Sequence, residues 1–197
     1  MSELNDNDLV AKALEGETEA FGELVRRYQR PVYGLIVRMV RNAAIAEEIA
    51  QEVFIKAYGR LESFDRRRRF SSWLFKVAHN ATIDHLRKRR VPTVPLESPP
   101  EEGAQLADVL AGPEREEPEQ IAVRGELAVA LERAMEVLRP EHREVLLLRF
   151  RHGLSYGEMA AVMALPLGTI KTHLHRARKA LARGLEGSDW APEDNEE

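Results

Sequence analysis

The chain has no cysteine among its 197 residues, so neither a disulfide bond nor a thiolate metal site can form. It also lacks an apolar run of roughly 18 residues, the length that a membrane-spanning helix needs. Its first residues, MSELNDNDLV, are acidic and do not have the basic and apolar regions of a signal peptide. These absences predict a cytoplasmic protein that is not inserted in a membrane.

Patterns that carry catalysis or ligand binding are also absent. The sequence shows no glycine loop for phosphate, no Ser/His/Asp arrangement and no metal-ligand spacing. His173 and His175 are two residues apart, so their side chains would diverge on a helix. We therefore expect no catalytic residue, no metal and no cofactor, and we interpret the chain as a binding protein rather than an enzyme.

Charge is distributed unevenly, although the net charge is only −4. Residues 60–90 hold ten basic and three acidic side chains, and residues 139–185 hold nine basic and three acidic ones. Acidic stretches at 1–23, 96–126 and 186–197 flank and separate these basic blocks. Because salt confines electrostatic fields to about 10 Å, each basic block can meet phosphates whatever the total charge. Two separate faces for nucleic acid are therefore expected.

Apolar residues recur at three- and four-residue steps, which is typical of α-helices. In the first part of the chain helices are expected over 21–39, 44–58 and 71–90, with Pro31 marking a kink or a new start. Ser71 is expected to cap the third of these helices. No alternating apolar pattern indicates a β-strand, so the predicted fold class is all-α.

The composition changes in the middle of the chain, where six prolines stand among many acidic residues. We therefore predict two small helical domains, residues 1–91 and 119–186, joined by an acidic proline-rich linker at 92–118. A disordered acidic tail is expected at 187–197.

The second domain has the pattern of a helix-turn-helix. Ser155 and Glu158 form a capping box that starts a short helix. The expected elements, in order, are helices over 121–138 and 141–150, a helix from Ser155 to Met163, a turn at 164–166 and a basic helix over 167–185.

That last helix is expected to have an apolar and a basic face. Its apolar stripe is Ile170, Leu174, Ala177 and Leu181. Arginine and lysine donate to guanine, and threonine can donate or accept, so the other face suits the major groove. A solvated basic helix in a small bundle is the alternative. The residues predicted to bind duplex DNA are Thr169, Lys171, Thr172, His173, His175, Arg176 and Lys179.

A second basic segment stands ahead of the helix expected over 71–90. Arg66, Arg67, Arg68 and Arg69 lie next to aromatic residues, and Arg87 opens another basic run. Guanidinium groups bind backbone phosphates, and aromatic faces stack on unpaired bases. This combination suits a protein that holds a DNA strand outside the duplex, although spacing alone favours a core position for Trp73.

The helix expected over 44–58 carries a further surface opposite its apolar stripe. An exposed isoleucine beside carboxylates suggests a docking patch for a protein rather than a solvated face. The residues of this patch are Glu48, Gln51, Glu52 and Ile55.

Together these segments resemble the extracytoplasmic-function (ECF) sigma factors, the minimal two-domain type of bacterial initiation factor. AEEIAQEVFIKAY at 46–58 resembles the helix that binds the polymerase clamp. FSSWLFKVAHN at 70–80 resembles the minus-ten promoter segment, and 154–178 resembles the minus-thirty-five helix-turn-helix. The likeness covers residues 20–90 and 120–185 in the order and spacing of the family.

The resemblance implies an alternative sigma factor that binds core RNA polymerase and directs promoter-specific initiation. Its first domain would capture a flipped base of the non-template strand, with Phe64 and Asn80 near the base and Arg38 near the strand. The residues predicted to bind the minus-ten element are Arg38, Phe64, Arg66, Arg67, Arg68, Arg69, Trp73, Lys76, Asn80 and Arg87. Lys76 and Val77 stand where primary sigma factors carry a tryptophan pair for melting, which implies stricter promoter demands. The linker would run through the polymerase cleft towards the RNA path.

The second domain would read the minus-thirty-five duplex through Lys171, Thr172, His175 and Arg176. The family often has arginine or serine at several of these positions, so the promoter bases remain open. Members are usually held inactive by an anti-sigma protein, which is often membrane-bound. An anti-sigma factor is therefore an expected partner beside core polymerase and promoter DNA.

Two other interpretations remain open from the residues alone. A helix-turn-helix repressor or activator would bind duplex DNA without polymerase, but it would normally dimerise, and no heptad zipper or ligand pocket is evident. A helical adaptor, such as an anti-sigma mimic, would use the basic faces for acidic proteins and would be indifferent to DNA.

Overall fold

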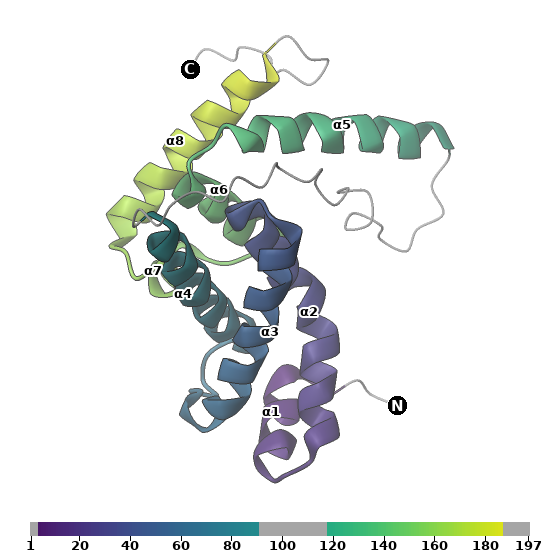
Figure 1. Cartoon of the computed structure of the whole chain (residues 1–197), viewed down its shortest axis with the longest axis vertical. Helices are drawn as coiled ribbons and strands as arrows, with labels where there is room; N and C mark the ends of the chain where they lie inside the picture. The colour runs from purple at the N-terminus through teal and green to yellow at the C-terminus, as the bar shows by residue number, and fades with distance from the viewer. Residues whose placement is uncertain (1–3, 91–117, 187–197) are drawn as a thin grey trace. The chain divides into compact units, whose positions relative to one another are not determined.

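The computed structural model describes residues 4–90 and 118–186 (Figure 1). Every element in these two ranges is a helix, which confirms the all-α fold class. The predicted tail lies outside the described residues, as does the predicted linker apart from Pro118. The elements are α1 (Asp6–Leu14), α2 (Thr18–Val40), α3 (Ala43–Gly59), the 3-10 helix η1 (Leu61–Ser63), α4 (Phe70–Arg90), α5 (Pro118–Glu136), α6 (Pro140–Leu146), the π-helical segment η3 (Leu147–Arg151), α7 (Tyr156–Met163) and α8 (Leu167–Leu185).

The described helices form two compact units. The first holds α1 to α4 together with α7, and the second holds α5, α6, η3 and α8. None of the described helices is both long and apolar enough to cross a membrane.

The first unit is built around α2, which packs against α1, α3 and α4. The predicted apolar spacing places Leu24, Val32 and Leu35 in its core without solvent exposure. α2 runs through Pro31 as one element, so no new helix starts there. Burial on both sides of the proline holds the two halves of α2 on the same core, which offsets the backbone hydrogen bond that proline cannot make.

The apolar spacing did not predict α1. The Asn5 side chain accepts a hydrogen bond from the Asp8 N–H (3.0 Å), which caps the helix, and Asp6 and Asp8 lie in its first turn. Leu9 and Val10 are buried. Figure 1 shows α1 beside the N-terminal part of α2.

Ser71 does not cap α4, which corrects the prediction from the sequence. The helix begins at Phe70, and the Trp73 N–H already donates to the Arg69 carbonyl (3.3 Å). Ser71 therefore lies in the first turn, where its side chain is buried. The helix starts early because Phe70 is buried against Phe64, which favours helical backbone at residue 70.

In the second unit α8 packs against both α5 and α6. Arg143 of α6 is buried and donates to three carbonyl oxygens at the end of α5, those of Met135 (3.0 Å), Glu136 (3.1 Å) and Leu138 (3.0 Å). The last carbonyls of a helix lack intrahelical donors, so this guanidinium supplies hydrogen bonds where α5 ends; the Met135 carbonyl also accepts from the Leu138 N–H (3.2 Å). The predicted helix over 141–150 is present, but it becomes π-helical from Leu147.

α5 and α8 approach each other closely at Gly184. A Cβ atom there would lie 2.9 Å from the Ala134 Cβ and 3.1 Å from its Cα. The pair of small residues thus lets the two helix backbones come together.

The predicted capping box is confirmed at the start of α7, where Ser155 and Glu158 bond each other's backbone N–H. α7 ends at Ala164, which adopts the left-handed conformation (φ 53°), and α8 has the predicted bounds, Leu167–Leu185. α7 packs on α4 within the first unit.

Candidate nucleic-acid and protein interfaces

The residues predicted to contact duplex DNA are spread over α8. Ile170, Leu174 and Ala177 are buried, as the apolar stripe predicts, and this orients the rest of the helix. Thr169 and His173 are only partly exposed, so they lie at the edge of the outer face. Fully exposed are Lys171, Thr172, His175, Arg176 and Lys179. Helical spacing places these five on one broad face, which leaves four nitrogen-bearing side chains facing outward.

The His173 side chain packs against α6 and does not face solvent alone. Its ring lies edge-on to the ring of His142 on α6, with centroids 5.4 Å apart. Burial lowers the pKa of His142; Glu141 acts in the opposite direction, and the charges of His173 and Arg176 lower it further. His142 is therefore less able than a free imidazole to carry a positive charge near neutral pH.

The four consecutive arginines form a turn between η1 and α4, called here the arginine turn (residues 65–69). All four arginine side chains are exposed. Asp65 organises the turn, because it accepts from the Arg67 N–H (3.1 Å) and from two atoms of the Arg67 guanidinium, Nε (2.9 Å) and Nη2 (3.1 Å). Hydrogen bonds from Arg67 lower the pKa of the Asp65 carboxyl, so it stays ionised.

An aromatic cluster lies on both sides of the arginine turn in sequence. Phe64 precedes the turn and packs on Phe70 and Trp73, with ring centroids 5.6 and 5.4 Å away. Tyr28 of α2 packs on Phe70 (5.5 Å). Phe64 and Phe70 are buried, whereas Trp73 is partly exposed. Of the two predicted aromatic contacts for DNA, Trp73 thus presents more surface than Phe64.

One face of α4 gathers the other residues predicted to contact the minus-ten strand. Trp73, Lys76, Asn80 and Arg87 recur at helical spacing, and the last three are exposed. The Arg87 guanidinium lies 4.0 Å from the Asp84 carboxylate. Arg38, on α2, is partly exposed and donates to the carbonyl of Gly34 (3.0 Å).

Glu158 of α7 lies beside the start of α4. Its carboxylate accepts from the Ser72 hydroxyl (2.7 Å) and is 3.7 Å from the Arg69 guanidinium. Partial burial raises the pKa of Glu158, but hydrogen bonds from the Ser155 N–H and from Ser72, together with the charge of Arg69, hold the pKa below its usual value.

The predicted docking patch lies on α3 as expected from its spacing. Ala46, Ile49 and Val53 are buried. Ile55 is 73% exposed, and Glu52 pairs with Lys56 (2.6 Å). The patch residues Glu48, Gln51, Glu52 and Ile55 are all exposed on the side of α3 opposite its buried stripe.

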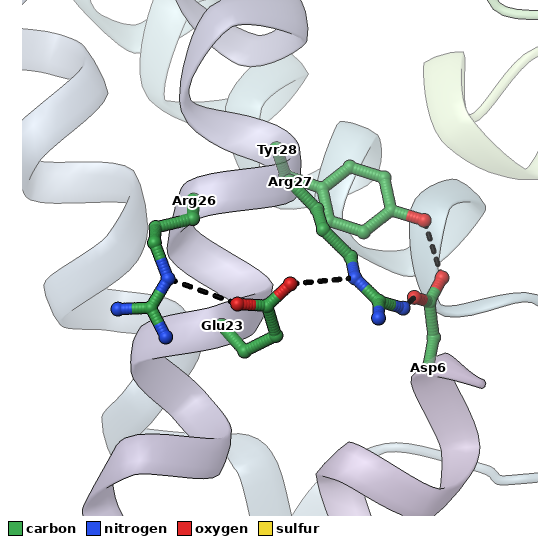
Figure 2. Close-up of polar contacts among 5 residues, drawn as sticks. All are labelled: Asp6, Glu23, Arg26, Arg27 and Tyr28. Atoms are coloured by element: carbon green, nitrogen blue, oxygen red, sulfur yellow. Dashed lines mark hydrogen bonds and ion pairs between the residues drawn. The ribbon is translucent and has the colours of Figure 1, made fainter. Parts of the chain in front are cut away.

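Polar contacts of α1 were missed from the sequence. Asp6 accepts from Arg27 Nη1 (3.1 Å) and from the hydroxyl of Tyr28, and Glu23 accepts from Arg26 (2.9 Å) and Arg27 (3.1 Å) (Figure 2). Burial and the neighbouring Asp6 carboxylate both raise the pKa of Tyr28. Arg27 and Tyr28 lie more than 20 residues from Asp6 along the chain, so helical spacing gives no signal for these two contacts.

Among the residues that the structure describes, no group of three His, Asp or Glu side chains is placed to hold an ion.

Two family models match the chain. Residues 24–91 match Sigma-70 region 2, and residues 128–181 match Sigma-70, region 4. The region 2 match contains α3, the arginine turn and α4, and the region 4 match contains the greater part of α8. The predicted docking patch and the predicted DNA-binding faces therefore lie on matched parts of the chain. The class of protein is thus that of transcription initiation factors with a region 2 and a region 4.

Relatives of similar length narrow the class. The chain is 34% identical to the ECF RNA polymerase sigma factor SigW of Bacillus subtilis over 89% of its own length and 94% of that protein. It is 36% identical to the ECF RNA polymerase sigma-E factor of Escherichia coli over 92% and 95%. The chain belongs to the ECF sigma factor family.

A solved structure with a similar fold is that of CnrH in complex with the cytosolic domain of CnrY. It covers 93% of this chain and 98% of CnrH, with a TM-score of 0.63 and 26% identity. Family membership decides among the three interpretations of the sequence. The chain is an alternative sigma factor that directs transcription initiation, not a polymerase-independent repressor or an adaptor.

Proposed function

We propose that the two basic faces bind separate promoter elements while the α3 patch binds core RNA polymerase. The observation that carries this proposal is the placement of exposed cations on two helices, α4 and α8, within two different compact units. Uncharged polar side chains, Asn80 on α4 and Thr172 on α8, accompany these cations. Binding to phosphates alone would not need them, whereas contacts to bases would.

The face of α8 reads the minus-thirty-five duplex. Arg176 and Lys171 donate to guanine O6 and N7, and Thr172 contributes a hydroxyl at the same surface. The Thr172 hydroxyl donates to the Gly168 carbonyl (2.9 Å) in the free protein, which leaves its oxygen able to accept from a base. Burial of Ile170 and Leu174 supports this role, because it fixes which side of α8 faces outward.

The arginine turn and the exposed face of α4 hold the minus-ten strand. The arginines bind phosphates, whereas Asn80 carries an amide that can donate to and accept from a base edge. Trp73 keeps part of its ring exposed beside the turn, where an unpaired base can stack. These contacts favour a single strand, since bases inside a duplex do not offer their faces.

The α3 patch docks on the polymerase. Its exposed isoleucine would lose contact with water on binding, and the carboxylates of Glu48 and Glu52 would set the orientation by pairing with cations. We also place the protein in the cytoplasm, with an anti-sigma factor as its regulator. The CnrH structure contains the cytosolic domain of CnrY, so a protein of similar fold forms a complex with a partner protein.

Two substitutions test whether α8 recognises bases and the arginine turn binds phosphates. In holoenzyme, Arg176→Ala is expected to cost about 1–3 kcal/mol of discrimination between promoter and mutated minus-thirty-five duplexes, because a bidentate contact to guanine is lost. Arg67→Ala is expected to weaken binding to promoter and random DNA alike. Footprinting with both variants measures these effects, and equal losses on promoter and random DNA for Arg176→Ala would contradict the assignment.

A further inference from the structure

We infer that α1 is a positioning element for DNA binding, which holds the arginine turn in place through Asn7 and is itself anchored through Asp6. This inference rests on the proposed role of the turn in binding the minus-ten strand. α1 lies outside the region 2 match, which begins at residue 24.

The contacts made by Asp65 fix the shape of the turn but not its position. The Arg68 N–H donates to the Asp65 carbonyl (2.9 Å), and Arg67 binds the Asp65 carboxylate through its backbone and side chain. All of these partners belong to the turn. The buried Phe64 and Phe70 hold the two ends of the turn, and Arg69 lies 3.7 Å from Glu158, but these contacts leave the backbone at Arg66 to be placed by another element.

Asn7 supplies such a contact at the beginning of the turn. Its Nδ2 donates to the backbone carbonyl of Arg66 at 3.0 Å, across 59 positions of the chain. Because the acceptor is a main-chain atom, the Arg66 side chain remains exposed for a phosphate. The bond restrains the backbone from which the cations project.

The Asp6 carboxylate anchors α1 to α2, so α1 can act as a rigid support. Its carboxylate binds both Arg27 and Tyr28 of α2, as Figure 2 shows, and Arg27 is held from its other side by Glu23. The Tyr28 ring packs on Phe70, the first residue of α4. The same tyrosine therefore links α1 to the aromatic residue that follows the turn directly.

This arrangement lowers the entropic cost of binding. Four adjacent cations repel one another, and an unrestrained turn would lose conformational freedom when it binds a strand. A turn that is already fixed in the free protein loses less, so its affinity is higher for the same contacts. Asn7 does not touch DNA in this account; it acts through Arg66 and its neighbours.

The test compares two neighbouring positions on α1. Asn7→Ala removes the bond to the turn, whereas Asp8→Ala changes an exposed side chain on the same short helix and serves as the control. Full-length variants, assembled with core polymerase, are titrated with two probes. One is a forked DNA with a single-stranded minus-ten region, and the other is a duplex that carries the minus-thirty-five element alone. Both titrations are repeated over a series of salt concentrations.

Asn7→Ala is expected to weaken binding to the forked probe about five- to tenfold and to leave its salt dependence nearly unchanged, because the same phosphates are contacted at a higher entropic cost. Binding to the duplex probe should not change. Tyr28→Phe keeps the ring on Phe70 but removes the hydroxyl that binds Asp6. It should also weaken binding to the forked probe, by a smaller factor than Asn7→Ala. Asp8→Ala should match the unmodified protein on both probes.

Arg67→Ala separates failure of this inference from failure of the proposed function. If Arg67→Ala weakens binding to the forked probe while Asn7→Ala does not, the positioning role of α1 is wrong and the DNA-binding role of the turn stands. If neither variant weakens it, the proposed function of the turn fails and the inference fails with it. Equal weakening of both probes by Asn7→Ala would also overturn the inference, since that pattern indicates general destabilisation.

Discussion

Single charged side chains in this protein act at the ends of helices, where backbone groups lack partners. Arg143 is the clearest case, because its buried guanidinium binds three carbonyls at the end of α5. A charged donor of this kind can be buried since its hydrogen bonds are made, and its removal leaves acceptors that water cannot reach easily.

Arg143→Met is therefore expected to destabilise the second unit by about 2–4 kcal/mol, because three hydrogen bonds are lost and methionine fills only part of the space. Urea denaturation followed by circular dichroism measures the change. Arg139→Met, at an exposed arginine just ahead of the same helix, is the matched control and should alter stability by less than about 0.5 kcal/mol. Similar midpoints for the two variants would show that the buried bonds contribute little.

Glu158 leads to a prediction about pH. Its pKa in the folded protein is below the ordinary value of 4.5, so the unfolded chain binds the proton more readily. The stabilisation that its carboxylate provides is present above pH 4.5 and is lost as the pH falls through the lower folded value. Urea midpoints should accordingly fall less between pH 7 and pH 3.5 for Glu158→Gln than for the unmodified protein. Parallel pH curves would argue against a stabilising carboxylate.

At the scale of helices, two glycines on α8 occupy opposite situations. Gly184 faces Ala134 so closely that a Cβ would overlap α5, whereas no other atom lies within 4 Å of a Cβ at Gly168. The distinction depends on tertiary packing, because both residues lie in the same helix.

Gly184→Ala is expected to destabilise the second unit by about 1–3 kcal/mol, since α5 and α8 must move apart. Gly168→Ala should instead be neutral or stabilising by up to about 1 kcal/mol, because alanine favours helical backbone. Thermal unfolding of the two variants compares them directly. A stabilised Gly184→Ala protein would mean that α5 does not pack on α8 in solution.

The elements that the sequence predicts well are those whose signals are local. The bounds of α8 and the capping box of α7 follow from apolar spacing and from two side chains three residues apart. α1 was missed because it is short and its stabilising partners, Arg27 and Tyr28, lie far along the chain. Ser71 was misassigned because the burial of Phe70, rather than the capping propensity of serine, determines where α4 begins.

The candidate surfaces, like the helices, were predicted where the signal is local and missed where it depends on tertiary packing. Exposure of Ile55 and of the arginine turn follows from helical phase and from charge. The partial burial of Thr169 and His173 did not follow, and for His173 it depends on His142 of α6, whose ring lies beside it. Sequence spacing thus finds the right helix and approximates its outer face, whereas the edges of that face are set by neighbouring elements.

At the scale of the whole chain, the two proposed DNA-binding faces are joined covalently and can act together on one promoter. Linking two binding units raises the effective concentration of the second once the first is bound. The α3 patch carries no predicted DNA contact, so its loss should affect assembly without altering promoter choice.

Glu52→Lys is expected to reduce core polymerase binding at least tenfold, because a carboxylate of the docking patch is replaced by a cation. Glu47→Lys makes the same change of charge at an exposed position beside the patch and should have a clearly smaller effect. Pull-down of core enzyme at matched protein concentrations provides the measurement. Equal retention of polymerase by both variants and the unmodified protein would remove α3 from the interface.

The position of α1 ahead of the region 2 match has a practical consequence for dissecting the protein. A fragment cut at residue 24 would keep Arg27 and Tyr28 but discard the carboxylate that both of them bind. The tyrosine hydroxyl would then lose its Asp6 partner, and α2 would lose the helix that packs on it, with the buried Leu9 and Val10. Expression fragments for crystallisation or NMR should therefore start at or before Leu4, not at the border drawn by sequence similarity.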